Sequence, residues 1–285
     1  MSAGWIAGDV RARGLVAADA TDVAATVAIA PGLEAAVAVL GQTRWMRDIG
    51  SATTVEAAQR ATFETLLWQL RVLAGWLPSE GVGIVRSCVA WFEIRNFEDR
   101  LAYFAGAPAE TPYELGRLGI ISRSLGGTNS GEDIRRLMRA SAWGDPGGEN
   151  AYTIRIWLRR MWHRRSRDAS PELRVWSDAA AWLFGLRERM AHRSGGDVVA
   201  ATPPSLPLSW NWVTSVTWSR SDLWRAEERW WAQVSQEGLQ LLHNPVGSRG
   251  PALGAVTTLA SSARRIATAL EVAAGVGGGD LDAAG

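Results

Sequence analysis

Three polar residues within the stretch WFEIRNFEDRLAYFAGAP are of a type and spacing that could support acid–base catalysis. Glu93, Asn96 and Arg100 follow one another at intervals of three and four residues, so they share one face if the stretch is helical. A carboxylate steered by the amide could act as a general acid or base, or the group could be a polar seam against a neighbouring helix. A similar stretch near the end of the chain has Ser262 and Arg265 in place of Glu93 and Asn96. This replacement favours the structural interpretation.

The histidines, the cysteine and the glycine-rich stretches form no recognisable site. His163, His192 and His243 are far apart, and none has companion ligands at metal spacing. Cys88 is the single cysteine, so an internal disulfide and the CxxC motifs are excluded. GGTNSG and GVGGGD lack the strand before and the helix after that a nucleotide cradle requires. We therefore predict no catalytic residues, no metal and no cofactor.

The arginine-rich stretch IRIWLRRMWHRRSRD is the sharpest electrostatic feature. In a helix its apolar side would be Trp157, Leu158, Met161 and Trp162. Its other side would carry Arg155, Arg159, Arg160, Arg164 and Arg167, while Arg165 lies off this pattern. Such a face could contact an acidic protein, lipid phosphates or nucleic acid, or it could be solvated and balanced by acids elsewhere. We name Arg155, Arg159, Arg160 and Arg164 as a possible partner interface.

The composition narrows the function classes further. All 30 basic residues of the 285-residue chain are arginine, which excludes a phosphate-binding loop that needs its lysine and Schiff-base chemistry on a lysine. The formal net charge of +1 does not favour nucleic acid as a partner. Hydrophobic residues make up 47% of the chain and include 16 tryptophans. They are enough for a sizeable core in which large indoles could anchor helices.

Neither a secretory signal nor a membrane span is expected. The amino terminus, MSAGWIAGDVRARG, lacks the basic-then-apolar order of a signal peptide. The longest apolar region, VAATVAIAPGLEAAVAVLG, is interrupted by Pro31, Gly32 and Glu34, whereas a bilayer requires about 20 uninterrupted residues. We therefore predict a soluble, cytoplasmic protein.

Apolar residues recur with the helical period in almost every periodic segment, which predicts an all-α fold. Thr53 followed by Glu56 has the pattern of a capping box, opening a helix that stops at Pro78. Its main stripe is Phe63, Leu66, Leu67, Leu70, Leu73 and Leu77, and a second stripe is Trp68, Val72 and Trp76. Two stripes predict a helix covered on two sides. Further helices are expected at about 90–104, 170–193, 221–242 and 259–275.

An internal repeat divides the predicted helices into three units. LEAAVAVLGQTRW aligns without a gap with GEDIRRLMRASAW, which places Thr43 opposite Ser141 and Trp45 opposite Trp143. EIRNFEDRLAYFAG likewise aligns with SARRIATALEVAAG, with the pairs Arg95 and Arg264, Leu101 and Leu270, and Gly106 and Gly275. We expect a first helical unit at 1–106, a second at 107–196, a third at 197–277 and a flexible tail at 278–285.

Several motifs, taken in order, resemble the C (or d) subunit of V/A-type rotary ATPases, the AC39-like family, in its actinobacterial branch. These motifs are GWIAGDVRARGLV, LGQTRW, LLWQLRVLAGWLP, WFEIRNFEDRLAYFAG, YELGRLG, LMRASAWGDPGG and LASSARRIATALEVAAG. The resemblance covers most of the chain. It implies a funnel-like subunit of three related helical bundles, and it makes Glu93, Ile94 and Asn96 a structural signature.

The function that the resemblance implies is mechanical. Such a subunit belongs to the central stalk, links the shaft to the membrane proteolipid ring, and transmits torque between ATP turnover and proton or sodium transport. It would have no catalytic site and would lie on the inner face of the cell membrane through its complex. One alternative is a freestanding helical binding module that uses the arginine-rich helix on nucleic acid or an anionic membrane surface. Another is an all-α enzyme with Glu93 as acid and base, which requires a concave pocket around that residue.

Overall fold

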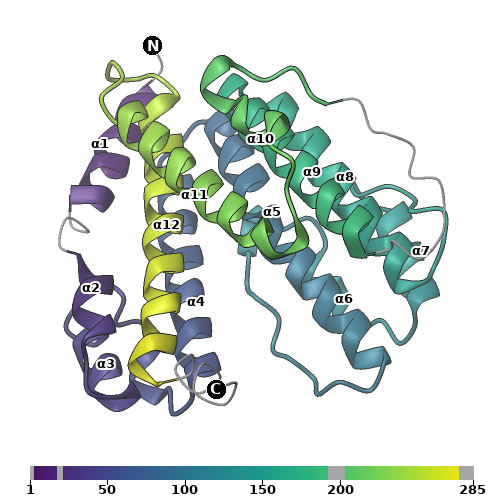
Figure 1. Ribbon diagram of the computed structural model, residues 1–285, viewed down its shortest axis with the longest axis horizontal. Coiled ribbons are helices and arrows are strands. Elements are labelled where there is room, and N and C mark those ends of the chain that lie inside the picture. The colour runs from purple at the N-terminus through teal and green to yellow at the C-terminus, as the bar shows by residue number, and fades with distance from the viewer. Residues whose placement is uncertain (1–2, 18–21, 192–202, 276–285) are drawn as a thin grey trace. The chain divides into compact units, whose positions relative to one another are not determined.

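Every regular element of the described residues is helical (Figure 1). The computed structural model describes residues 3–17, 22–191 and 203–275, and no strand occurs within these ranges. The all-α class expected from the period of the apolar residues is therefore confirmed. The predicted tail at 278–285 lies outside the described residues.

The chain divides into two compact units. Residues 1–85 and 235–285 form the first, and residues 86–234 form the second. The boundaries fall within α5 (Ser79–Phe104) and α11 (Leu223–Leu241). The three consecutive units expected with boundaries near residues 106 and 196 stay a prediction, and the last long helix packs with the amino-terminal helices.

The first unit is organised around α12 (Gly250–Ala273), drawn in yellow in Figure 1. The other helices that lie wholly in this unit are α1 (Ala3–Ala17), α2 (Val23–Ala28), α3 (Leu33–Leu40) and α4 (Val55–Ala74). α12 packs against α4, α2 and α1. Close packing also requires glycine where α12 meets the last turns of α11, because a Cβ on Gly254 would lie 2.5 Å from the carbonyl oxygen of Gly238.

Helix α4 confirms one predicted stripe and corrects two details. Thr54, rather than Thr53, caps the helix, since its hydroxyl accepts a hydrogen bond from the amide of Ala57 at 3.2 Å. The buried leucines of the main stripe are Leu66, Leu67, Leu70, Leu73 and Leu77. The second stripe is not covered as expected, because the side chains of Trp68 and Trp76 are 37% and 55% exposed. The helical period identified both stripes but could not tell which of them meets another element.

The second unit contains the rest of α5 and the helices that follow it. These are α6 (Ser122–Leu125), α7 (Gly131–Arg139), α8 (Ala151–Ala169), α9 (Pro171–Ala191), α10 (Trp212–Ser215) and the first part of α11. Helices α8 and α9 pack along each other. One buried cluster joins α5, α7 and α8, with Phe97, Ile134 and Leu158 among its members. Short 3-10 turns in the two units are Ile49–Ser51, Gly116–Leu118, Leu208–Trp210 and Arg220–Asp222.

Candidate functional site

A tryptophan-bearing turn follows α3 in the first unit. The hydroxyl of Thr43 donates to the carbonyl oxygen of Leu40 at 2.8 Å and accepts from the amide of Trp45 at 3.1 Å. The hydroxyl therefore satisfies a carbonyl at the end of the helix and fixes the direction in which the chain leaves it. The indole of Trp45 is completely buried.

The same turn recurs after α7 in the second unit. The hydroxyl of Ser141 donates to Met138 O at 2.8 Å and accepts from the amide of Trp143 at 3.0 Å. Trp143 is also completely buried. The aligned pairs Thr43 with Ser141 and Trp45 with Trp143 thus make the same hydrogen bonds, so this part of the sequence repeat corresponds to a repeated local structure.

The ends of α5 and α12 are a second repeated feature. The amide of Ala105 donates to Leu101 O at 3.3 Å, and the amide of Ala274 donates to Leu270 O at 3.0 Å. Each helix is then followed by a glycine with positive φ, 96° at Gly106 and 72° at Gly275. Glycine is favoured there because it adopts this conformation without a Cβ clash.

Glu93 lies on α5 in the second unit and is completely buried. Its carboxylate accepts hydrogen bonds from the amide of Ile121 at 2.7 Å, from the amide of Ile120 at 2.8 and 3.1 Å, and from the indole nitrogen of Trp143 at 3.1 Å. Hydrogen bonds to a carboxylate are stronger than those between neutral groups. They therefore offset the free-energy cost of burying the carboxylate. Glu93 therefore holds the backbone at 120–121 and the Trp143 turn on α5.

Asn96 lies three residues after Glu93 on α5 and makes hydrogen bonds to the segment that leads up to Ile120 and Ile121. Its side-chain amide donates to Tyr113 O at 2.9 Å, and its side-chain oxygen accepts from the amide of Tyr113 at 2.7 Å. Ile94, between the two polar residues, is buried in the apolar cluster. Glu93, Ile94 and Asn96 therefore fasten the segment 107–121 to α5, with polar side chains toward its backbone and an apolar side chain toward the core.

Arg100 is the third residue of the polar face predicted for α5, but its hydrogen bonds go to a different segment from those of Glu93 and Asn96. Its guanidinium donates to the carbonyl oxygens of Gly126 and Thr128, and it lies 5.0 Å from the ring centroids of Tyr103 and Phe104. Each of the three residues of this face is thus engaged with the protein itself. The geometry gives no support to Glu93 as an acid and base, because its oxygens are buried and occupied by backbone and indole donors.

The arginines of α8 are divided between internal and exposed positions. Arg159 donates to Glu188 at 2.9 Å and to Glu98 at 3.3 Å, and thereby joins α8 to α9 and α5. Arg160 and Arg164 are exposed and Arg155 is half-buried. Within the described part of the chain none of these last three forms a hydrogen bond or ion pair.

The apolar side of α8 faces the protein. The indole nitrogen of Trp157 donates to Trp143 O at 2.7 Å, and that of Trp162 donates to Ser87 O at 3.2 Å. Arg165, which does not fit the arginine face, lies 5.3 Å above the ring of Trp143. In the sequence, only the position of Arg165 off the arginine face indicated that this side chain points inward. No sequence signal indicated that Trp143 pairs with Glu93 on α5.

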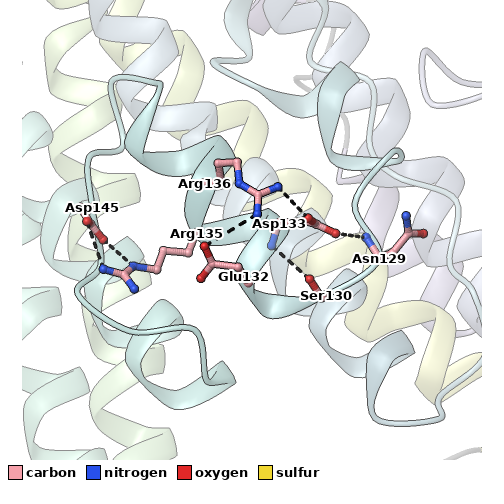
Figure 2. A network of polar contacts seen from close by, with 7 residues as sticks. All are labelled: Asn129, Ser130, Glu132, Asp133, Arg135, Arg136 and Asp145. Atoms are coloured by element: carbon pink, nitrogen blue, oxygen red, sulfur yellow. Dashed lines mark hydrogen bonds and ion pairs between the residues drawn. The ribbon is translucent and has the colours of Figure 1, made fainter.

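Polar residues around the start of α7 form a network at the surface (Figure 2). Ser130 caps the helix by accepting from the amide of Asp133 at 3.1 Å, while the Asp133 carboxylate accepts from the amide of Asn129 at 3.0 Å. The hydrogen bond from Asn129 is the main reason that the pKa of Asp133 is lowered, and Ser130 acts in the same direction. Arg135 donates twice to Asp145, at 2.9 and 3.3 Å, and this pairing is the main reason that the pKa of Asp145 is lowered. The network fastens the turn after α7 back onto the helix.

The remaining titratable candidates are also structural. His163 lies 2.6 Å from a carboxylate oxygen of Asp178, which also accepts from Arg167 at 3.0 Å and so links α8 to α9. His243 contacts Leu239 O at 3.0 Å, and His192 lies outside the described residues. Burial raises the pKa of Cys88 to about 12, which favours the protonated thiol. No group of three or more potential metal ligands occurs among the residues described.

Comparison with protein-family models and with curated proteins finds no match for this chain. Of the helices in the described ranges, none combines the length and the apolar character that a membrane crossing requires.

Proposed function

We propose that the chain is a non-catalytic subunit of the central stalk of a V/A-type rotary ATPase. The observation that carries this proposal is the use of Glu93, Ile94 and Asn96. The resemblance makes these residues a structural signature, and here they fasten the segment 107–121 to α5 through buried hydrogen bonds. Buried side chains that hold a backbone segment in place fit a structural element that transmits torque better than they fit a reactive site. In this proposal the subunit lies at the inner face of the cell membrane through its complex.

The recurring local structures support the finer architecture that belongs to this proposal, three pseudo-repeated helical bundles in a funnel-like subunit. The turns at Trp45 and Trp143 repeat the same hydrogen bonds, and the ends of α5 and α12 repeat the same backbone pattern. Repeats of this kind are typical of proteins built from related helical units.

The packing suits the transmission of torque. A coupling element must resist shear, and close-packed helices with large rigid side chains have low compressibility. The indoles of Trp45, Trp143 and Trp210 are fully buried, and Trp91 stacks on Phe184 with the ring centroids 5.4 Å apart. In our proposal the subunit connects the shaft to the proteolipid ring and passes rotation between ATP turnover and proton or sodium transport.

Copurification and deletion in the source cell test the proposal together. We expect a tagged chain to bring down a proteolipid ring and shaft subunits, and we expect its deletion to uncouple ATP hydrolysis from ion transport while the catalytic head still assembles. The double variant Glu93→Gln with Asn96→Ala should reproduce the uncoupling, whereas exposed Glu110→Gln should not. Normal coupling in the deleted strain would refute the proposal.

A binding module for nucleic acid or an anionic membrane receives less support. Arg159 is engaged with Glu98 and Glu188, and the indoles of Trp157 and Trp162 donate to backbone carbonyls of the protein. This alternative predicts salt-sensitive binding that is lost when Arg160 and Arg164 are replaced.

A further inference from the structure

A cavity in the second unit lies between α9 and the start of α11. Its volume is about 370 Å³, and it is lined by Arg187, Arg220, Ser221, Leu223 and Trp224. Arg187 belongs to α9, and the other four residues belong to the 3-10 turn before α11 and to the first turn of that helix. A cavity of this volume is at the small end of the range that holds a bound small molecule.

The cavity has free guanidinium donors on two of its sides. Arg220 forms no hydrogen bond or ion pair within the part of the chain that the structure describes. Arg187 Nη2 lies 3.6 Å from a carboxylate oxygen of Glu227, and about half of each side chain is exposed. A long, solvated pair of this kind is weak and leaves most donors of the guanidinium available. The nearby acid Asp222 is engaged with Arg225, which donates to it at 2.5 Å.

Trp224 adds a flat aromatic group to the lining of the cavity. The residue is 58% exposed, and its indole N–H has no acceptor among the described residues. The guanidinium carbon of Arg225 lies 5.0 Å from the ring centroid, over one face of the indole, which leaves the other face for a ligand. An exposed aromatic face stacks readily on a nucleobase, because every base has a π-face.

Ser221 supplies an acceptor at the same cavity. Its hydroxyl oxygen lies 2.8 Å from that of Ser219. Ser219 donates its own hydrogen to the carboxylate of Asp222, so the hydroxyl of Ser221 is the donor in the contact between the two serines. The oxygen of Ser221 therefore keeps a lone pair that can accept from a hydroxyl group of a ligand.

We propose that this cavity binds a nucleotide. Its phosphate accepts from Arg220 and Arg187, since guanidinium groups match phosphate oxygens in charge and geometry. The base stacks on Trp224, and a sugar hydroxyl donates to Ser221. The nucleotide is either free or the end of a nucleic-acid strand. This site is independent of the proposed stalk function, since it requires only residues of the second unit.

Isothermal titration of the full-length chain with AMP, at constant ionic strength, tests the site directly. We expect saturable binding that weakens about tenfold in Arg220→Gln, because a charge-assisted hydrogen bond is lost. A loss of about tenfold is also expected in Trp224→Leu, which removes the stacking surface. Arg164→Gln and Trp68→Leu are the matched controls, since they remove an exposed arginine and an exposed indole that do not line the cavity. Circular dichroism checks that each variant is folded.

Simpler and larger probes complete the test. AMP should bind more tightly than inorganic phosphate or adenosine, because only AMP meets both the arginines and the indole. A 5′-phosphorylated tetranucleotide distinguishes the two sources: its exclusion supports a free nucleotide, and binding that is weakened in Arg220→Gln supports a strand end. The proposal is overturned if AMP gives no saturable binding, if inorganic phosphate binds as tightly as AMP, or if Arg164→Gln weakens binding as much as Arg220→Gln.

Discussion

The carboxylate of Glu93 lies 3.1 Å from the indole nitrogen of Trp143, and both side chains are completely buried. This contact joins the middle of α5 to the turn that follows α7, across fifty positions of the chain. The same carboxylate holds the amides of Ile120 and Ile121. One side chain therefore fixes two separate segments, and its loss should affect both.

Replacement of Glu93 should be among the most destabilising single changes in the second unit. In Glu93→Gln only one acceptor oxygen remains, and the new NH2 group faces either the indole N–H of Trp143 or the amides of Ile120 and Ile121, so we expect a loss of about 2–4 kcal/mol in the free energy of unfolding. Urea denaturation followed by circular dichroism measures it. Exposed Glu110→Gln is the control, with an expected change within about 0.5 kcal/mol.

A local measurement separates this role from general damage. Hydrogen exchange at the amides of Ile120 and Ile121 should accelerate in Glu93→Ala more than exchange in α12, because only the former lose their acceptor. Equal acceleration throughout the chain would show that Glu93 does not hold this segment specifically.

The two tryptophan turns should respond alike to loss of the hydroxyl. Thr43→Ala and Ser141→Ala each leave a helix-terminal carbonyl and a tryptophan amide without their partner, so we expect a loss of about 1–2 kcal/mol for each. Thermal or urea unfolding of both variants measures this, with exposed Ser205→Ala as the reference. A loss confined to one variant would mean that the two turns, although they share a geometry, do not share an energetic role.

The helical period and the repeat predicted local structure well. Leu66 and Leu70 are buried as the stripe on α4 required, and the aligned residues Trp45 and Trp143 lie in two turns with the same hydrogen bonds. Such features depend on residues close together in the chain, whose spacing determines which side chains share a face.

Long-range pairing was less accessible from the sequence. Nothing in the periodicity indicated that Trp143 meets Glu93, or that α12 packs with the amino-terminal helices. Apolar stripes mark which faces prefer burial but do not identify their partners. Trp68 and Trp76 illustrate the limit, since they form a clear stripe and yet remain exposed.

Two glycine-to-alanine substitutions should have opposite effects on stability. A Cβ on Gly254 would lie 2.5 Å from Gly238 O and 3.0 Å from Leu242 Cγ, so Gly254→Ala forces α11 and α12 apart. We expect a loss of about 1–3 kcal/mol from this overpacking.

A Cβ on Gly83, inside α5, would meet no atom of another element within 4 Å. Gly83→Ala should stabilise the protein by about 0.5–1 kcal/mol through helix propensity. Urea unfolding of both variants measures the difference, and a loss in Gly83→Ala equal to that of Gly254→Ala would contradict the packing argument.

The network at the start of α7 should make stability depend on acid pH. The pKa values of Asp133 and Asp145 are lowered in the folded protein, so the ionised carboxylates favour the folded state. Their contribution is complete above the unfolded pKa of about 3.9 and is lost as the pH falls through the lower folded values. Asp133→Asn should therefore reduce the melting temperature at pH 6, and the difference from wild type should shrink as the pH approaches 3. Melting curves across this range measure the effect, with Asp168→Asn, exposed on α8, as the control. A difference that is constant with pH would mean that the charge of Asp133 does not contribute.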